Sequence, residues 1–183
     1  TFNIKNWNFV VNKIIEMDIR AKFKIKARFE LLNFKQIELF KQANFHLEFG
    51  LQTADDFVSE KIDRKNNLTR IKKAMQMLNE YGISYETSII YGLPFQTYKS
   101  FEETIDFILK YGNGKVKAFA LQIFKGTKIY RYRKEYGIKC LKMTRFELPT
   151  VIKNNWITYN DWKRMNKLAQ STNSSNIFDK IAV

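Results

Sequence analysis

The chain has 183 residues, a length that suits one domain with a sizeable buried core and room for a small appendage. Hydrophobic residues make up 45% and charged residues 27%, the balance of a globular protein rather than a disordered one. Cys140 is the single cysteine, so this chain alone forms no disulfide, zinc cage or iron–sulfur cluster. A lone thiol is typical of a reducing compartment, and we expect a cytoplasmic protein.

The chain is strongly basic, with 32 lysines and arginines against 18 acidic residues. Such an excess indicates either nucleic-acid binding or a compositional bias of the genome. We favour the bias, because 24 of these residues are lysine and only 8 are arginine, the side chain that grips phosphates bidentately. No run of roughly 18 apolar residues indicates a membrane span, and no secretory signal is visible.

Helical and strand patterns alternate along the first three quarters of the chain. Short apolar or alternating runs predict four strands, at about 22–31, 45–50, 84–92 and 116–124. Apolar residues at helical spacing predict helices at about 8–20, 34–43, 55–61, 68–81, 98–111 and 128–136. This order is typical of a parallel sheet, either doubly wound or part of a (β/α) barrel. No glycine-rich phosphate-binding pattern follows a strand, which weighs against a nucleotide-binding sheet.

The pattern changes in the last quarter of the chain. A final helix is predicted through residues 162–168, with Asn160 or Asp161 as its N-cap. The small polar residues 171–176 are predicted to form a loop or a frayed tail.

Functional side chains in parallel α/β folds gather at the carboxyl ends of the strands. Three of the predicted strands end in a turn that contains glycine, at Gly50, Gly92 and Gly126. Glycine lets the backbone approach a ligand closely, but turn glycines alone are more simply explained as structural.

The residues around these turns resemble, as a set, the second half of a radical S-adenosylmethionine (radical SAM) domain. The matching segments, in order, are LEFGLQT at 47–53, IDRK at 62–65, IIYGLPFQTYKSF at 89–101 and FKGT at 124–127. The closest subset contains anaerobic coproporphyrinogen dehydrogenase and the cobalamin-binding proteins similar to magnesium-protoporphyrin IX monomethyl ester oxidative cyclase. Residues 1–3 resemble the end of a segment that closes the second strand of those barrels.

The resemblance implies a partial TIM-type (β/α) barrel of about four parallel strands with outer helices in residues 1–137. Residues 138–183 would form a small, mainly helical C-terminal extension. The three cluster cysteines of the family precede the matched part, so we expect a fragment that is inactive alone and holds no cofactor, metal or catalytic residue. The full-length, oxidoreductase-like enzyme is expected to use S-adenosylmethionine and a 4Fe–4S cluster, and the subset adds cobalamin as a further expectation.

The resemblance assigns cofactor contacts to seven residues: Glu30, Gly50, Gln52, Arg64, Ser88, Ile90 and Gly92. Gln52 matches the position that hydrogen-bonds the ribose, and Arg64 matches the arginine that meets the methionine carboxylate. Glu30, expected to end the first strand, matches a carboxylate that contacts the cofactor. Ser88 stands where porphyrinogen-type relatives carry aspartate, which weakens a porphyrin-specific assignment. Ile90 and Gly92 match residues that form an apolar seat for adenine.

Two alternatives stay open: a basic RNA-binding module and a non-catalytic relative that has lost its cluster. Lys22, Lys24 and Lys26 line one side of the first strand, as RNA contacts or as protection of an edge strand. The expected partners are a small-molecule substrate of the full-length enzyme and a second copy joined through the open barrel edge. Nucleic acid is less favoured, and no membrane is expected. His46, the only histidine, is expected to be structural.

Overall fold

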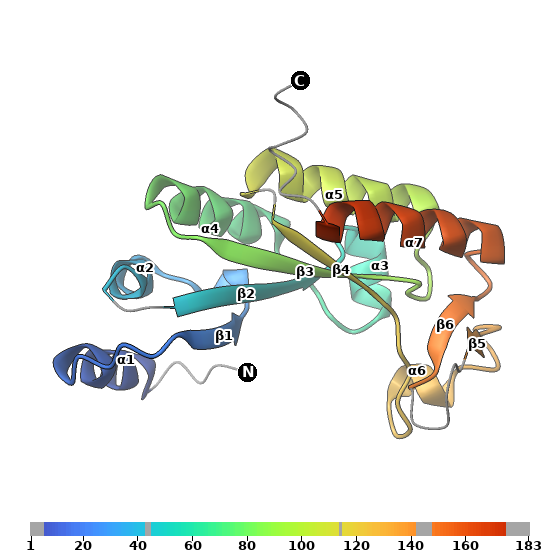
Figure 1. The fold of residues 1–183 in the computed structure, drawn as a ribbon. Coiled ribbons are helices and arrows are strands. Elements are labelled where there is room, and N and C mark those ends of the chain that lie inside the picture. The colour runs from blue at the N-terminus through green and yellow to red at the C-terminus, as the bar shows by residue number, and fades with distance from the viewer. Residues whose placement is uncertain (1–5, 43–44, 114, 142–147, 175–183) are drawn as a thin grey trace.

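The computed structural model describes residues 6–42, 45–113, 115–141 and 148–174. Four parallel strands form one sheet in the order β1-β2-β3-β4, with helices over one face (Figure 1). The strands are β1 (Phe23–Ala27), β2 (Phe45–Gln52), β3 (Tyr85–Tyr91) and β4 (Val116–Ala120). The predicted α/β fold with about four parallel strands and outer helices is confirmed. The predicted resemblance at residues 1–3 lies outside the described residues.

The helices follow the predicted order, with shorter ends. They are α1 (Trp7–Glu16), α2 (Phe34–Phe40), α3 (Asp56–Lys61), α4 (Leu68–Glu80), α5 (Tyr98–Tyr111) and α6 (Lys128–Arg131). Side-chain oxygens of Asn33, Asp55, Asn67 and Thr97 accept backbone N–H groups where α2 to α5 begin. These caps explain why the helices begin where they do, because the first N–H groups of a helix have no partner inside it.

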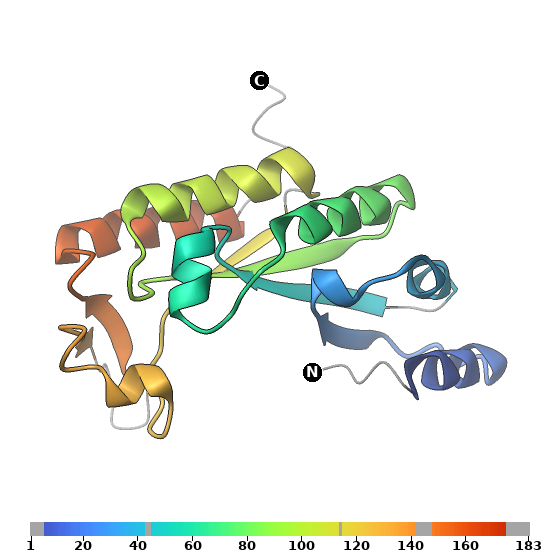
Figure 2. The ribbon, with the colours of Figure 1, turned by 180° about the vertical axis from the view of Figure 1, so that it is seen from behind.

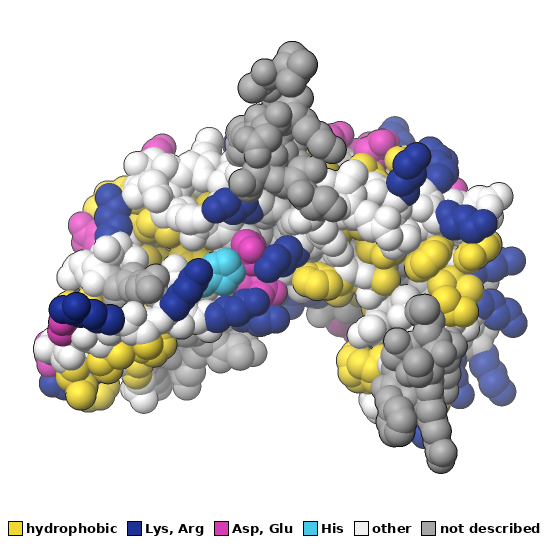
Figure 3. Space-filling model, in the orientation of Figure 1, with side chains coloured by type: hydrophobic (Ala, Val, Ile, Leu, Met, Phe, Trp, Pro, Cys, Tyr) yellow, Lys and Arg dark blue, Asp and Glu magenta, His cyan; other side chains and the backbone are white. Residues whose placement is uncertain are grey.

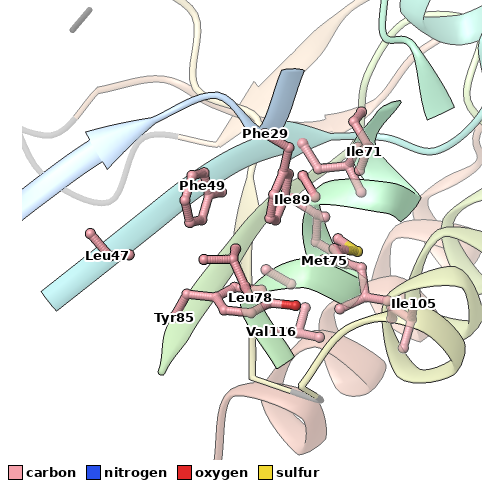
Figure 4. Close-up of a cluster of buried hydrophobic side chains, with 14 of the residues drawn as sticks. Phe29, Leu47, Phe49, Ile71, Met75, Leu78, Tyr85, Ile89, Ile105 and Val116 are labelled. Carbon is pink, nitrogen blue, oxygen red and sulfur yellow. The ribbon is translucent and has the colours of Figure 1, made fainter. Parts of the chain in front are cut away.

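Figure 2 shows α4 and α5 lying over one face of the sheet, and alternate side chains of the strands build an apolar core beneath them. Phe49 of β2 stacks on Phe29 at 4.3 Å between ring centroids, and both rings meet Tyr85 of β3 edge-on at 5.7 Å. Figure 4 shows three side chains of α4 in this core, Ile71, Met75 and Leu78, and Met77 packs against the core partly buried. No helix in the described part of the chain is long and apolar enough to cross a membrane.

The C-terminal part adds a small antiparallel pair and a long helix. β5 (Lys139–Leu141) pairs with β6 (Thr150–Lys153), and α7 covers Tyr159–Ser174. The pair was not predicted, because strands of three and four residues are too short to show a period. The cap of α7 was predicted wrongly. Thr158 Oγ1 accepts the backbone N–H of Asp161 at 3.1 Å, and the Asp161 carboxylate accepts that of Thr158 at 2.9 Å.

α7 lies along the outer edge of the sheet, next to β4 and α5 (Figure 1). The backbone N–H of Ala118 donates to Asn173 Oδ1 at 2.8 Å, and Asn173 Nδ2 donates to Ala118 O at 3.0 Å. The Asn173 amide therefore occupies the place of a neighbouring strand. These bonds hold residues 171–173 in α7, so the frayed tail predicted from residue 171 is wrong for that part.

Candidate cofactor-binding site

The carboxyl end of β2 brings together three predicted site residues. Arg64, in the segment between α3 and α4, donates from Nη2 to Gly50 O at 2.7 Å. Gln52 ends the strand at a bulge and has a φ of 69°, unusual for a residue other than glycine. A Cβ atom at Gly50 would lie 2.7 Å from Gln52 Nε2 and 3.2 Å from Arg64 Nη2. A larger residue at this position would therefore push the ends of the Gln52 and Arg64 side chains from the places they occupy.

The segment that carries Arg64 is fastened to the sheet by two further side chains. Asn66 Nδ2 donates to the backbone oxygens of Leu51 at 3.0 Å and Thr53 at 2.7 Å. Arg28 Nη2 donates to Lys65 O at 3.1 Å. Asn66 and Arg28 carry no motif of their own, so the sequence offered no signal for their role. Both hold Arg64 over the end of β2.

Glu30 lies near this group, but not at a strand end as predicted. β1 ends at Ala27, and Glu30 lies in the short 3-10 turn Phe29–Leu31, because the chain turns there to bury Phe29 in the core. Its carboxylate accepts a hydrogen bond from Arg28 Nη2 at 2.9 Å. Burial raises the pKa of Glu30, but the Arg28 hydrogen bond and charge and two backbone N–H groups outweigh burial and hold that pKa below its ordinary value.

Arg64 has donor capacity that the protein does not use. Burial and the neighbouring Arg28 lower the pKa of the guanidinium, while Glu30 raises it, and the group remains charged. Arg64 Nε is buried and has no hydrogen-bond partner among the described residues. A buried N–H without an acceptor costs free energy, so the position suits a ligand that brings an acceptor.

The three predicted residues in and just after β3 lie in two places, within the sheet and at its carboxyl edge. Ser88 lies within the sheet, and its Oγ donates to Glu48 Oε1 at 2.8 Å. Ile90 is nearer the strand end and packs against an apolar cluster formed with the C-terminal part. Gly92 begins the turn after the strand with a φ of 89°. Ile90 and Gly92 are thus at the carboxyl edge, whereas the Ser88 hydroxyl is already engaged.

The turn after β3 is fixed by two buried amides that sequence analysis did not single out. Gln96 Oε1 accepts the N–H of Gly92 at 2.9 Å, and its Nε2 donates to Ile90 O at 3.0 Å. Asn154, from the C-terminal part, donates to Gly92 O at 3.2 Å. The C-terminal part therefore braces the turn expected to seat adenine.

The face of the sheet away from the helices carries a charged network that was also missed. Glu48 is almost fully buried and lies 3.2 Å from Lys24 Nζ and 3.3 Å from Lys26 Nζ. Burial opposes ionisation of Glu48, but hydrogen bonds from Ser88 and both lysines lower its pKa. Two of the three lysines considered as RNA contacts are therefore paired within the sheet.

A second carboxylate on this face, Glu86, lies 2.6 Å from Lys117 Nζ and 3.0 Å from His46 Nε2. Burial opposes its ionisation, but the Lys117 and His46 hydrogen bonds lower its pKa. Figure 3 shows the histidine, in cyan, among these acidic and basic side chains. His46 is thus hydrogen-bonded through Nε2 to a carboxylate on this face of the sheet. No group of three or more His, Cys, Asp or Glu among the described residues suits a metal ion.

A sequence model of the Radical SAM superfamily matches residues 9–108, more than half of the chain. The chain therefore belongs to the radical SAM superfamily. The oxygen-independent coproporphyrinogen III oxidase of Helicobacter pylori is 32% identical over 82 residues, which cover 44% of this chain and 18% of that protein. The enzyme of the same name from Cereibacter sphaeroides is 34% identical over 71 residues, 38% of this chain and 16% of that protein.

Two solved structures share the fold. The coproporphyrinogen III oxidase of Escherichia coli, a radical SAM enzyme, aligns with a TM-score of 0.64 and 16% identity over 93% of this chain and 38% of its own. A radical S-adenosylmethionine methyltransferase from Kitasatospora setae aligns with a TM-score of 0.69 and 10% identity over 92% of this chain and 41% of its own. The chain thus spans less than half of these structures, and the likeness supports a partial barrel.

Proposed function

We propose that this chain forms one wall of the S-adenosylmethionine site of a radical SAM enzyme. The observation that carries the proposal is the group of Gly50, Gln52 and Arg64 at the end of β2, with Arg64 Nε left without an acceptor. The Gln52 amide, which has both donors and an acceptor, would bind the ribose hydroxyls. The Arg64 guanidinium would bind the carboxylate of the methionine part.

The surrounding residues position these two side chains. Gly50 leaves the space that both need, and Glu30, held by Arg28, places a carboxylate beside the Arg64 guanidinium. Ile90 and the turn at Gly92 would provide the apolar seat for adenine, braced by Gln96 and the C-terminal part. Ser88 would contribute through Glu48, to which its hydroxyl already donates.

S-adenosylmethionine, when bound beside a reduced 4Fe–4S cluster, supplies a radical that abstracts hydrogen from a substrate. The side chains present fit the S-adenosylmethionine part. They do not fit the cluster, because Cys140 is the only thiolate that the chain offers. The cluster cysteines would then belong to another part of the full-length enzyme, and this chain alone would be inactive. Iron and sulfide analysis after anaerobic reconstitution tests this: a stoichiometric cluster on the isolated chain would overturn it.

Binding of S-adenosylhomocysteine, a stable analogue, tests the wall itself. We expect saturable binding in ligand-observed NMR, with Arg64→Gln weakening it about tenfold through loss of one charge-assisted hydrogen bond. Arg20→Gln is the matched control, since Arg20 is exposed, pairs with Asp18 and precedes β1, at the amino end of the sheet, whereas Gln52 is at the carboxyl end of β2. Equal affinity of the wild type and the Arg64 variant for the analogue would show that Arg64 does not contact it.

We also propose that two copies associate through β1. Among the described strands, β1 pairs only with β2, so its other edge presents unpaired backbone groups. We propose as well that the barrel part ends at residue 137 and that residues 138–183 form the C-terminal extension. Light scattering at increasing concentration should show a rising mean mass. A constant monomer mass would contradict association.

A further inference from the structure

A hollow of about 590 Å³ lies beyond the carboxyl end of β4, between the chain leaving that strand, α6 and the β5–β6 pair. Its size is within the usual range for sites that hold small organic molecules. The hollow is at the same end of the sheet as Gln52 and Arg64, because all four strands are parallel.

Most side chains that line this hollow are apolar. Ile123 leads in from β4, Ile138 and Cys140 come from β5 and the residue before it, and Leu148 and Pro149 precede β6. The wall is held in place by backbone bonds from β4 to the extension: the N–H of Ile123 donates to Pro149 O at 3.1 Å. A ligand there would bury an apolar body against a wall anchored to the sheet.

Every charged side chain in the described lining is basic: Lys125, Arg133 and Lys139. No described carboxylate forms an ion pair with any of the three, in contrast to Lys24, Lys26 and Lys117 on the sheet. Arg133 lies over the Tyr130 ring at 4.1 Å and donates from Nη1 to Tyr130 O at 2.6 Å. This stacking fixes the guanidinium at the hollow and leaves other N–H groups of its fork for a ligand.

We infer that the hollow is a recognition site for a small molecule with an apolar body and an anionic group, such as a carboxylate. The apolar wall takes the body, and the three cations take the charge. The inference that this ligand is the substrate rests on the proposed function, since the hollow opens at the end of the sheet where the cofactor wall lies. Binding itself needs neither S-adenosylmethionine nor a cluster.

Two fluorescent probes of similar shape test the charge requirement in the full chain. Anilinonaphthalene sulfonate carries an apolar body and an anion, and N-phenylnaphthylamine lacks the anion. We expect one sulfonate bound per chain, about tenfold tighter than the amine. Arg133→Gln combined with Lys139→Gln should raise the sulfonate Kd about tenfold and leave the amine Kd within about twofold. Equal affinity for both probes, or no binding, would overturn the inference.

Alkylation of Cys140 shows whether the sulfonate probe binds in the hollow, because Cys140 is the only cysteine of the chain and lines the hollow. At a sulfonate concentration ten times its Kd, alkylation of Cys140 by iodoacetamide should slow about tenfold, since about one site in eleven stays empty. An unchanged rate would place the probe elsewhere and overturn the inference.

Two further variants separate possible failures. Arg164→Gln is the matched control, because Arg164 lies over the Tyr98 ring at 3.8 Å on α7 and outside the hollow. It should leave both probe affinities unchanged, and a tenfold loss there would overturn the assignment to Arg133. Arg64→Gln should weaken the cofactor analogue and leave the sulfonate probe unaffected, so failure of the cofactor wall and failure of the hollow give different results.

Discussion

The two faces of the sheet are built from neighbouring residues of the same strands, yet they have opposite chemistry. On β2, Phe49 is fully buried in the aromatic core beneath the helices, while the preceding Glu48 faces away and is bridged by two lysines. Both side chains are almost inaccessible to solvent. Burial therefore does not by itself reveal which residues supply stability and which organise charge. The side chains that each residue contacts make that distinction.

The largest effect should follow a change on the apolar face. Phe49→Ala removes a ring that stacks on Phe29 and meets Tyr85, and it leaves a cavity under α4. We expect a loss of about 3–5 kcal/mol in the free energy of unfolding, measured by urea titration. Phe124→Ala is the control, because Phe124 is half exposed and its loss should cost much less. A smaller loss from Phe49→Ala than from a change at Glu48 would break the comparison of the two faces.

A moderate effect should follow on the charged face. Glu48→Gln leaves Lys24 and Lys26 without their carboxylate while keeping the shape, and we expect a loss of about 1–2 kcal/mol at neutral pH. Glu103→Gln on α5 is the control, since its pair with Lys99 is exposed and should contribute less than about 0.5 kcal/mol. Equal losses of unfolding free energy from the two variants would show that a buried ion pair of Glu48 stabilises the fold no more than an exposed one.

The same face predicts a pH dependence. The pKa values of Glu48 and Glu86 lie below the ordinary 4.5 in the folded protein, so the unfolded chain binds more protons in acid. Their contribution is present above pH 4.5 and is lost as the pH falls through the folded values. Urea titrations across this range should show the loss, and Glu48→Gln with Glu86→Gln should flatten it. An unchanged slope in the double variant would assign the acid sensitivity to other groups.

The smallest effect concerns a residue on neither face. Asn173→Ala removes both hydrogen bonds to Ala118 at the edge of β4, and we expect a loss of about 0.5–1 kcal/mol in the free energy of unfolding. Hydrogen exchange at the Ala118 amide should quicken more than exchange at Ile89, which is in the centre of the sheet. Equal changes at both amides would mean that the variant loosens the whole fold rather than the edge.

The sequence predicted the elements that have a clear period. The strand near residue 85 and the helix at 98–111 are where they were expected, because the spacing of apolar residues is a local signal. The end of the first strand was predicted too late, since a turn that buries Phe29 depends on a core assembled from distant residues. The α7 tail was missed for the same reason: Asn173 is helical because β4 lies beside it.

The candidate site was predicted in part. Gly50, Gln52 and Arg64 were named from the resemblance to the radical SAM family, and the structure brings them together at the end of β2. Arg28, Asn66 and the buried Gln96 were not named, because their roles are hydrogen bonds to backbone atoms, and any polar side chain shows the same pattern in a sequence. Supporting residues of this kind become visible only when the backbone they hold is known.

The Asn173 amide has a consequence for how the sheet can grow. Within the described residues, its two hydrogen bonds engage the backbone of β4 at the point where a further strand would pair. The edge of β1 has no such stop. Extension of the sheet is therefore directional: a strand from elsewhere, for example from a second copy, can add at β1 without displacing any described strand, whereas addition at β4 must first displace α7.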